Sequence, residues 1–360
     1  MESAKPSLDL VSAVTDEHVL RTLMRHRRLT RAELAAEIGI SKPTAAESVR
    51  RLTERGLVAD TGERTPGGRG RGRVGSYFAL APAVGVALAV TISPAGVVAE
   101  CLDAYGDVVS RAARRITRPA RPRQVSAALR RVAEQARAAA GQPARLAVVG
   151  AADPVDRATG RLVQLPDAPF LVGTLDPVAI LAPLEVVVDN DVNWAALAEP
   201  AGAGDFAYLY LGEGLGCAIV NDGTVRRGHN GLTGEIAHVV TTGPDGRAVQ
   251  FIKMFDGLNL RRPESTAIDV DRLLAADTRT RQTIGTAVAG VIAAITALAD
   301  PHEIVIGGTW GPGLIDDIRT AAAGLPRPVT VRPAAPTPEP VLTGVRTEAL
   351  RRLRTALTTP

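Results

Sequence analysis

Residues 30–75 read TRAELAAEIGISKPTAAESVRRLTERGLVADTGERTPGGRGRGRVG, and this stretch decides the fold of the N-terminal part of the chain. Ser41 is a residue type that caps helix N-termini, and three apolar residues follow it at helical spacing: Ala45, Val49 and Leu52. Residues 31–38 predict a shorter amphipathic helix before it, and Gly39 permits a tight bend between the two. Two helices joined in this way are typical of a helix-turn-helix, whose second helix enters the major groove of DNA.

A second nucleic-acid signal follows the second helix directly. Residues 56–58 begin an extended run, residues 66–73 (PGGRGRGR) predict a flexible tip, and residues 74–80 predict a returning strand. Glycine lets the backbone approach a minor groove closely, and guanidinium groups favour the negative potential there. The stretch therefore predicts a winged helix that binds double-stranded DNA. The expected DNA contacts are Ser41, Lys42, Thr44, Glu47, Arg50 and Arg51 on the helix and Arg69, Arg71 and Arg73 on the wing.

The charge of the 360-residue chain is unevenly placed. Its formal net charge is +4. Residues 1–80 contain 14 Lys and Arg against 10 Asp and Glu, while the remainder contains 28 of each. All of the excess positive charge therefore lies in the N-terminal part, where neutralisation of DNA phosphates would require it.

Cysteine usage and hydropathy indicate a soluble, cytoplasmic protein. Cys101 and Cys217 are too few for a disulfide framework and fit a reducing compartment. No apolar run is expected to reach transmembrane length, and the N-terminus lacks the basic-then-apolar order of a signal peptide. We expect no membrane contact.

The composition changes after residues 81–83, which predicts a DNA-binding domain over 1–81 and a second domain over 82–360. Buried strands precede helices in two successive blocks, which predicts an α/β fold with lobes over 82–195 and 196–344 and a closing helix over 345–360. Ligands in such folds lie at strand ends that face the cleft between the lobes. The expected strands are 84–92, 96–102, 108–112, 146–150, 186–189, 206–211, 216–220 and 303–306, and the expected helices outside the helix-turn-helix are 16–27, 122–140, 194–199, 283–298 and 346–357.

Three motifs in a fixed order carry a resemblance to a known family. They are VVVDNDVNWAALAE at 186–199, LYLGEGLGCAIVNDGTVRRGHNGLTGEIAHV at 209–239 and PHEIVIGGTW at 301–310. Together with the winged helix they resemble the ROK family of repressors and sugar kinases over essentially the whole chain. The resemblance implies an actin-like, ribonuclease-H-like sugar kinase fold in the C-terminal part and a homodimer or homotetramer.

The same resemblance implies a ligand site. Asp191 is the counterpart of the family's catalytic base, and Asn190 would contact a sugar hydroxyl. Glu235 and His238 match residues that line the sugar pocket, and Asp167 stands near a sugar-binding asparagine. The alternative is structural, with Asp191 capping the following helix and His238 satisfied in the core.

The phosphate side departs from the family pattern. Residues 91–95 (TISPA) replace an Asp-x-Gly-Gly-Thr loop, so the carboxylate is lost and Pro94 removes an amide donor. An alternative register over residues 87–91 recovers only the threonine. Glu213 stands where a phosphate-binding loop carries Thr, and its charge would repel phosphate. The family's zinc site needs three cysteines after His238, and none is present there. We expect no metal, no cofactor and no phosphoryl transfer, so Asp191 would be a vestigial base.

The sequence therefore favours a transcriptional regulator, expected to be a repressor, that binds an inverted repeat as a dimer. A sugar or sugar phosphate in the cleft would shift the spacing of the paired DNA-binding domains. Two alternatives stay open: an active ATP-dependent sugar kinase with a regulatory DNA-binding domain, and a ligand-free pseudokinase scaffold for dimerisation.

Overall fold

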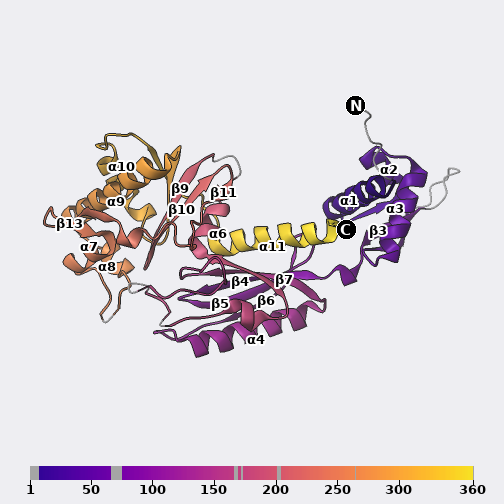
Figure 1. The fold of residues 1–360 in the computed structure, drawn as a ribbon, viewed down its shortest axis with the longest axis horizontal. Coiled ribbons are helices and arrows are strands. Elements are labelled where there is room, and N and C mark those ends of the chain that lie inside the picture. Colours follow the sequence, from indigo (N-terminus) through magenta and orange to yellow (C-terminus); the bar gives the residue numbers. More distant parts are fainter. Residues whose placement is uncertain are drawn as a thin grey trace.

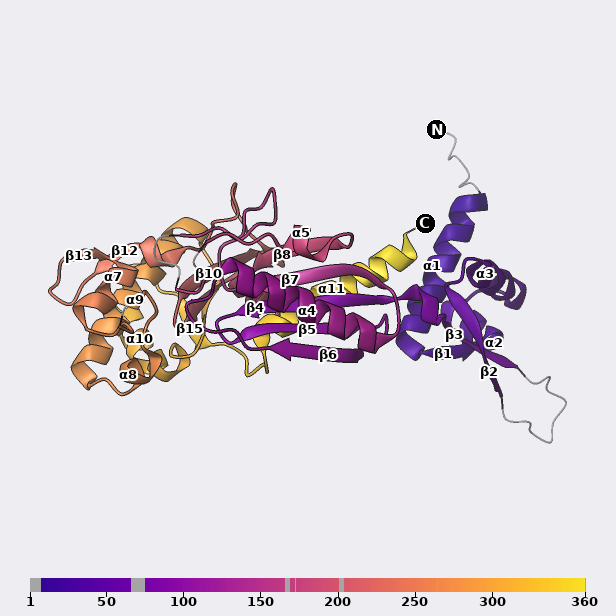
Figure 2. The same cartoon turned by 90° about the horizontal axis from the view of Figure 1, so that it is seen from below.

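The computed structural model describes residues 8–65, 75–165, 169–171, 173–200, 204–263 and 265–359. The molecule is elongated, with the N-terminal winged helix at one end and two α/β lobes following along the long axis (Figure 1). The view turned by 90° shows the same linear order (Figure 2). Residues 66–74, 166–168 and 172, on which several sequence predictions fall, lie outside the described residues.

The N-terminal part is a three-helix domain with a small sheet of order β1-β3-β2. The chain leaves α2 through Gly39 in the left-handed conformation with φ 76°. Ser41 caps α3, because its side chain accepts a hydrogen bond from the Thr44 amide. The predicted helix-turn-helix is thus confirmed with its boundaries. Its elements are α1 (Leu8–His26), β1 (Arg28–Thr30), α2 (Arg31–Ile38), α3 (Lys42–Glu54), β2 (Val58–Arg64) and β3 (Ser76–Leu80).

α1 begins earlier than the predicted start at residue 16. No glycine or proline interrupts the chain between Leu8 and His26, so nothing in the sequence stops the helix from extending toward the N-terminus. The prediction underestimated the helix because its first two turns carry no clear apolar stripe, and Leu10 and Val11 are exposed.

The first lobe is a five-stranded sheet of order β6-β5-β4-β7-β8. The first three strands in the chain pair antiparallel, whereas β7 and β8 run parallel to β4. α4 covers one face of this sheet (Figure 2). The elements are β4 (Val86–Ser93), β5 (Gly96–Leu102), β6 (Val108–Arg114), α4 (Pro122–Ala140), β7 (Ala144–Ala151), α5 (Pro177–Leu181), β8 (Glu185–Asn190) and α6 (Asp191–Leu197).

The second lobe repeats this strand order as β11-β10-β9-β14-β15. Again the strands early in the chain pair antiparallel, and the two strands that follow the long helix are parallel. The elements are β9 (Phe206–Leu211), β10 (Leu215–Asn221), β11 (Thr224–Val225), the hairpin β12 (Val240–Thr242) and β13 (Ala248–Gln250), α7 (Phe251–Gly257), α8 (Val270–Leu274), α9 (Thr278–Ala299), β14 (Glu303–Gly307), α10 (Ile315–Ala322) and β15 (Thr330–Pro333). The repeated topology confirms the predicted two-lobed α/β fold.

The last helix, α11 (Pro340–Thr358), returns to the first lobe and also reaches the winged helix. It packs on α6, β4 and β7, and its far end contacts α1 (Figure 1). One buried cluster accordingly runs without a break from Val19 and Leu23 of α1 to Val345 and Leu353 of α11. The DNA-binding domain therefore shares a hydrophobic core with the first lobe.

α9 corrects the expectation that no segment reaches transmembrane length. It has 22 residues and contains an 18-residue window with a mean hydropathy of 1.7, so by length and composition alone it could cross a membrane. Its apolar face, which includes Ile284, Val288 and Ile292, is fully buried in the second-lobe core. A core helix of a folded domain passes the same test as a membrane span, because both need an apolar surface.

Candidate functional site

One side of α3 is exposed and carries most of the predicted DNA contacts. The exposed residues are Ser41, Lys42, Thr44, Glu47 and Arg50, while the opposite side packs into the domain. The Ser41 hydroxyl is occupied by capping, at 3.2 Å from the Thr44 amide nitrogen. Arg50 donates to Glu47 at 2.6 Å and also bonds Glu54. The face thus presents one lysine, the Thr44 hydroxyl and an arginine held along the helix.

Arg51 does not lie on this face, contrary to the prediction. Its guanidinium donates to Asp16 of α1, with 2.6 Å between Nη2 and Oδ1. Ser48 donates to the same carboxylate at 2.5 Å. Because Asp16 is only 6% exposed, it requires a positive partner, and Arg51 supplies one. Arg51 therefore connects α3 to α1, and its guanidinium is directed toward Asp16.

The predicted wing contacts Arg69, Arg71 and Arg73 lie outside the described residues. The two strands of the hairpin that carries these residues, β2 and β3, are among the described residues. β2 and β3 pair antiparallel from Val58 opposite Leu80 to Arg64 opposite Ser76. The described strands of this hairpin begin directly after α3, and β2 contacts α3.

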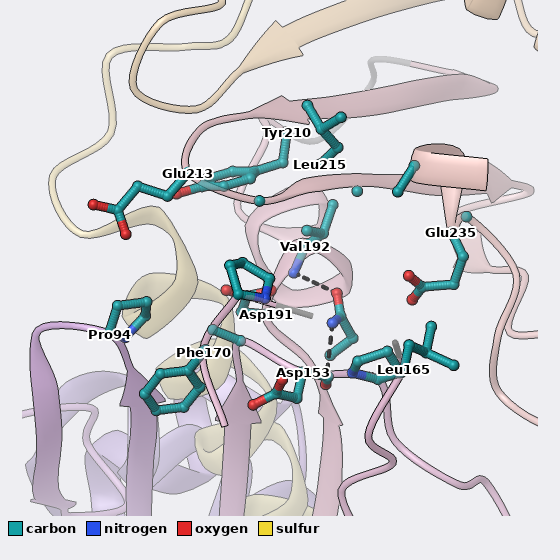
Figure 3. A pocket seen from close by; sticks show the side chains of 18 of the residues that line it. Pro94, Asp153, Leu165, Phe170, Asp191, Val192, Tyr210, Glu213, Leu215 and Glu235 are labelled. Carbon is teal, nitrogen blue, oxygen red and sulfur yellow. Dashed lines mark hydrogen bonds between the residues drawn. The ribbon is translucent and has the colours of Figure 1, made fainter. Parts of the chain in front are cut away.

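A cleft of about 450 Å³ lies between the two lobes and is lined from both. Asn190, Asp191, Glu235 and His238 all contribute to it, so the structure brings together four of the five predicted ligand residues. Asp191 and Glu235 lie on opposite sides of this space (Figure 3). The fifth, Asp167, lies outside the described residues.

Asn190, and not Asp191, caps α6. The Asn190 Oδ1 accepts a hydrogen bond from the Val192 amide at 2.9 Å, and its Nδ2 donates to the Asp153 carbonyl at 3.2 Å (Figure 3). The capping role considered for Asp191 is therefore wrong. His238 is only partly buried beside the cleft, which also disagrees with a core histidine.

Both predicted acids in the cleft bind protons more tightly than usual. Burial raises the pKa of Asp191 to about 7. Burial likewise raises the pKa of Glu235 to about 7. A carboxyl group with a pKa near neutrality can accept a proton from a hydroxyl when it is ionised and donate a hydrogen bond to a hydroxyl when it is protonated. The cleft is therefore suited to bind hydroxylated ligands.

Asp153 was missed by the sequence reasoning. It follows strand β7 by two residues, is 2% exposed and lines the same cleft. Burial, reinforced by the charge of Asp191, raises the pKa of Asp153 to about 8. The signal that could have found it is its position, because side chains after parallel strands of such sheets point toward ligands.

Two segments line the side of the cleft where family kinases hold phosphate. Pro94 and Ala95 form the turn between β4 and β5, and the Ala95 amide donates to the Ser93 hydroxyl at 3.3 Å. Glu213, between β9 and β10, forms ion pairs with Arg118 at 2.7 Å and with Arg262 at 2.9 Å. Arg118 belongs to the first lobe, so this carboxylate joins the two lobes at the position where family kinases carry a phosphate-binding loop.

The residues near His238 do not fit the family's zinc ion. The hairpin β12–β13 and its turn, residues 240–250, contain no cysteine or histidine. Within the described ranges, no group of three His, Cys, Asp or Glu side chains has the arrangement of a metal site. A tetrahedral zinc site needs four such donors.

Comparisons with known proteins agree with both halves of the chain. A family model described as the ROK family matches residues 95–250, and one described as winged helix-turn-helix DNA-binding matches residues 14–59. A glucokinase of Halalkalibacterium halodurans is 49% identical over 70 residues, which are 18% of this chain and 21% of that protein. A Caldicellulosiruptor sp. protein named "Putative xylose repressor" is 24% identical over 239 residues, 64% of this chain and 59% of that protein.

A solved structure shares the whole architecture. It is a ROK family transcriptional regulator described as a homolog of the E. coli MLC protein, with a TM-score of 0.60 and 18% identity. The match covers 97% of this chain and 99% of that one, so it shows the same fold from the winged helix to α11. The chain spans only about a fifth to a third of the length of the first curated relatives.

Proposed function

Because the chain joins a ROK family domain to an N-terminal winged helix-turn-helix domain, we propose that it is a transcriptional regulator that binds double-stranded operator DNA. The observation that carries this proposal is the exposed side of α3, with Lys42, Thr44 and Arg50 on a helix whose other side is packed. A helix presented in this way reads the major groove. The relative named as a xylose repressor favours repression over activation.

The assembly and the wing belong to the same proposal. A homodimer or homotetramer would pair two winged helices on an inverted repeat in the cytoplasm, where the DNA is. The domain boundary is placed at residue 81, between the end of β3 at Leu80 and the start of β4. Replacing Arg71 with alanine is expected to weaken operator binding by ~1–3 kcal/mol, as loss of a minor-groove arginine would.

The cleft is proposed to sense a small sugar-like ligand and not to transfer phosphate. Asp191, Glu235 and His238 support hydroxyl recognition because they line one enclosed space. Glu213 argues against nucleotide binding because it takes both arginines that could otherwise meet a phosphate there.

α11 supplies a route from the cleft to the DNA-binding domain. Val341, near its start, lines the cleft, and Leu353 and Leu357, near its end, belong to the cluster that contains α1. Arg354 donates to the Ala104 carbonyl at 2.9 Å. Ala104 lies in the turn between β5 and β6, and the adjacent Tyr105 contacts the winged helix. Any ligand that shifts the lobes would therefore act on α11 and, through it, on α1.

Selection of bound DNA tests the regulator directly. The full chain is incubated with genomic fragments, and the retained fragments are sequenced. We expect a shared inverted repeat with the native chain and weaker, uniformly reduced retention with Lys42→Ala, because a phosphate contact carries no sequence information. Lys253→Ala in α7 removes the same charge at the other end of the molecule and should retain the native pattern. Unenriched fragments would contradict the proposal.

One observation keeps an enzyme as a second candidate. Asp191 lies in the cleft with a pKa raised to about 7, which suits a general base, and the relatives include glucokinases. ATP-dependent phosphorylation of a hexose that is abolished by Asp191→Asn would establish a kinase. The ligand-free scaffold, by contrast, predicts that Asp191→Ala leaves DNA-binding regulation unchanged.

A further inference from the structure

Three carboxylates share the cleft without a basic partner. Asp153 and Asp191 come from the first lobe and Glu235 from the second, and all three line the same space (Figure 3). Among the described residues, none of the three forms an ion pair with a lysine or arginine. The neighbouring acids are paired: Asp189 meets Arg227 at 2.6 Å, and Glu213 meets Arg118 and Arg262. The carboxyl groups of the cleft that have no basic partner are therefore gathered in this trio.

Asp153 is the least satisfied member of the trio. Only 2% of this residue is exposed, and neither carboxylate oxygen has a hydrogen-bond partner of good geometry within the described part of the chain. The Leu171 backbone amide lies near enough to lower the pKa of this carboxyl group, but not enough to offset its burial. A buried acceptor without a donor costs several times what a normal hydrogen bond contributes. Such a group persists where a ligand supplies the donor.

The groups around Asp153 limit the chemical class of a ligand that could donate to it. The charged and titratable groups that line the cleft, among the described residues, are the trio, Glu213, Arg118, His238, Tyr210 and Cys217. A neutral hydroxyl would leave three clustered carboxyl groups to share protons, whereas a cation would stabilise their charged forms. The described residues do not offer three protein ligands with the arrangement of a metal site. An organic ammonium group, which needs acceptors without a fixed coordination geometry, fits this arrangement.

We propose that the cleft ligand is an amino sugar or amino polyol whose protonated amine is held by Asp153 with Asp191 and Glu235. This inference rests on the proposed ligand-sensing function and names the chemical class of the ligand. The hydroxyl groups of such a ligand would meet His238 and the remaining oxygens of the acids. The size of the cleft, about 450 Å³, suits a molecule of this kind.

Calorimetry on the full chain without DNA tests the class. The probes are glucosamine, galactosamine and mannosamine, each with its neutral parent hexose and its N-acetyl derivative. At least one amine should bind about 10- to 100-fold more tightly than both matched neutral compounds, the range expected for a hydrogen bond between charged groups. Equal or tighter binding of the neutral compounds, or no binding of any amine at ~10 mM, overturns the proposal.

Variants locate the effect. Asp153→Asn should reduce the preference for the amine to less than threefold, roughly the loss of one charged partner. Asp222→Asn, the same change on an exposed turn of the second lobe, should preserve it. An unchanged preference in Asp153→Asn overturns the role of Asp153, and the native-chain comparison stands even if that variant does not fold.

Operator binding is measured separately, so the two proposals can fail independently. Amine-selective binding without an effect on DNA would keep the ligand class and refute the sensing function. Operator binding that responds only to neutral sugars would keep the sensing function and refute the proposed ligand class.

Discussion

At the scale of single residues, the cleft acids give the protein an unusual pH dependence. A carboxyl group with a raised pKa in the folded state is penalised when it ionises. Its contribution to stability is complete below its unfolded pKa and is lost as the pH rises through the folded pKa. For Asp153 this window runs from the ordinary value of 3.8 to about 8, and Asp191 and Glu235 act in the same direction up to about 7.

Replacing Asp153 with asparagine should therefore stabilise the protein at alkaline pH. We expect a gain of ~1 kcal/mol or more at pH 8, which raises the Tm by about 2–4 °C, because a buried charge is removed. At pH 4 both side chains are neutral and the gain should vanish. Thermal unfolding by circular dichroism at the two pH values measures this difference. A gain that is the same at both values would show that packing, not ionisation, is responsible.

Glu213 is the residue that separates this cleft from a nucleotide site. Glu213→Gln removes the carboxylate that Arg118 and Arg262 share. Two released guanidinium groups attract anions, so affinity for pyrophosphate should rise by roughly 3- to 10-fold, measured by calorimetry. Glu63→Gln on β2 breaks an ion pair with Arg28 of β1 and serves as the matched control. Unchanged pyrophosphate binding in Glu213→Gln would show that the arginines do not face the cleft in solution.

At the scale of elements, a glycine allows α11 to pack closely against α6. A Cβ atom on Gly344 would lie 1.9 Å from the Trp194 carbonyl oxygen of α6, so the two helices approach backbone to backbone. Glu100, buried under α11, receives Arg346 at 2.6 Å and Arg111 at 2.7 Å. These contacts fix α11 between the cleft and α1.

Gly344→Ala should push α11 away from α6. Overpacking of this kind costs ~1–3 kcal/mol, although alanine alone would favour a helix. Urea unfolding should show a lower midpoint for this variant, and the effect of a cleft ligand on operator binding should shrink. Gly324→Ala after α10 meets only an ordinary contact at 3.6 Å and should match the native midpoint. A native midpoint for Gly344→Ala would refute the tight seating of α11.

The elements that the sequence predicted well are those with local signals. The Ser41 cap and Gly39 define α2 and α3, and residues 96–102, 122–140 and 206–211 are observed with the predicted limits. The short helices α5, α7, α8 and α10 were missed because one or two turns carry too little periodicity. Arg51 was misassigned because its partner, Asp16, is 35 residues away and invisible to helical spacing.

The candidate site divides in the same way. Asn190, Asp191, Glu235 and His238 were found through motifs, and the fold gathers them in one cleft. Asp153 belongs to no motif, and its significance comes from burial without a donor, which only the folded chain reveals. The ion pairs of Glu213 were likewise not predictable, since Arg118 and Arg262 come from distant segments of both lobes.

At the scale of the whole molecule, the winged helix packs directly against the first lobe. Arg27 binds Asp107 of the first lobe through two hydrogen bonds of 2.6 and 2.9 Å. Tyr105 accepts from the Leu80 amide at 3.1 Å and donates to the Arg27 carbonyl at 3.2 Å. With the shared apolar core, these contacts join the winged helix to the first lobe, as the proposed coupling between cleft and DNA requires.

The most direct test of the regulator is the ratio of specific to nonspecific DNA affinity. Fluorescence anisotropy would compare a duplex recovered by selection with the same bases in scrambled order, at one fixed salt concentration. A winged-helix regulator should bind the selected duplex at least ~10³-fold more tightly. Equal affinity for the two duplexes would contradict sequence-specific regulation, whatever the cleft binds.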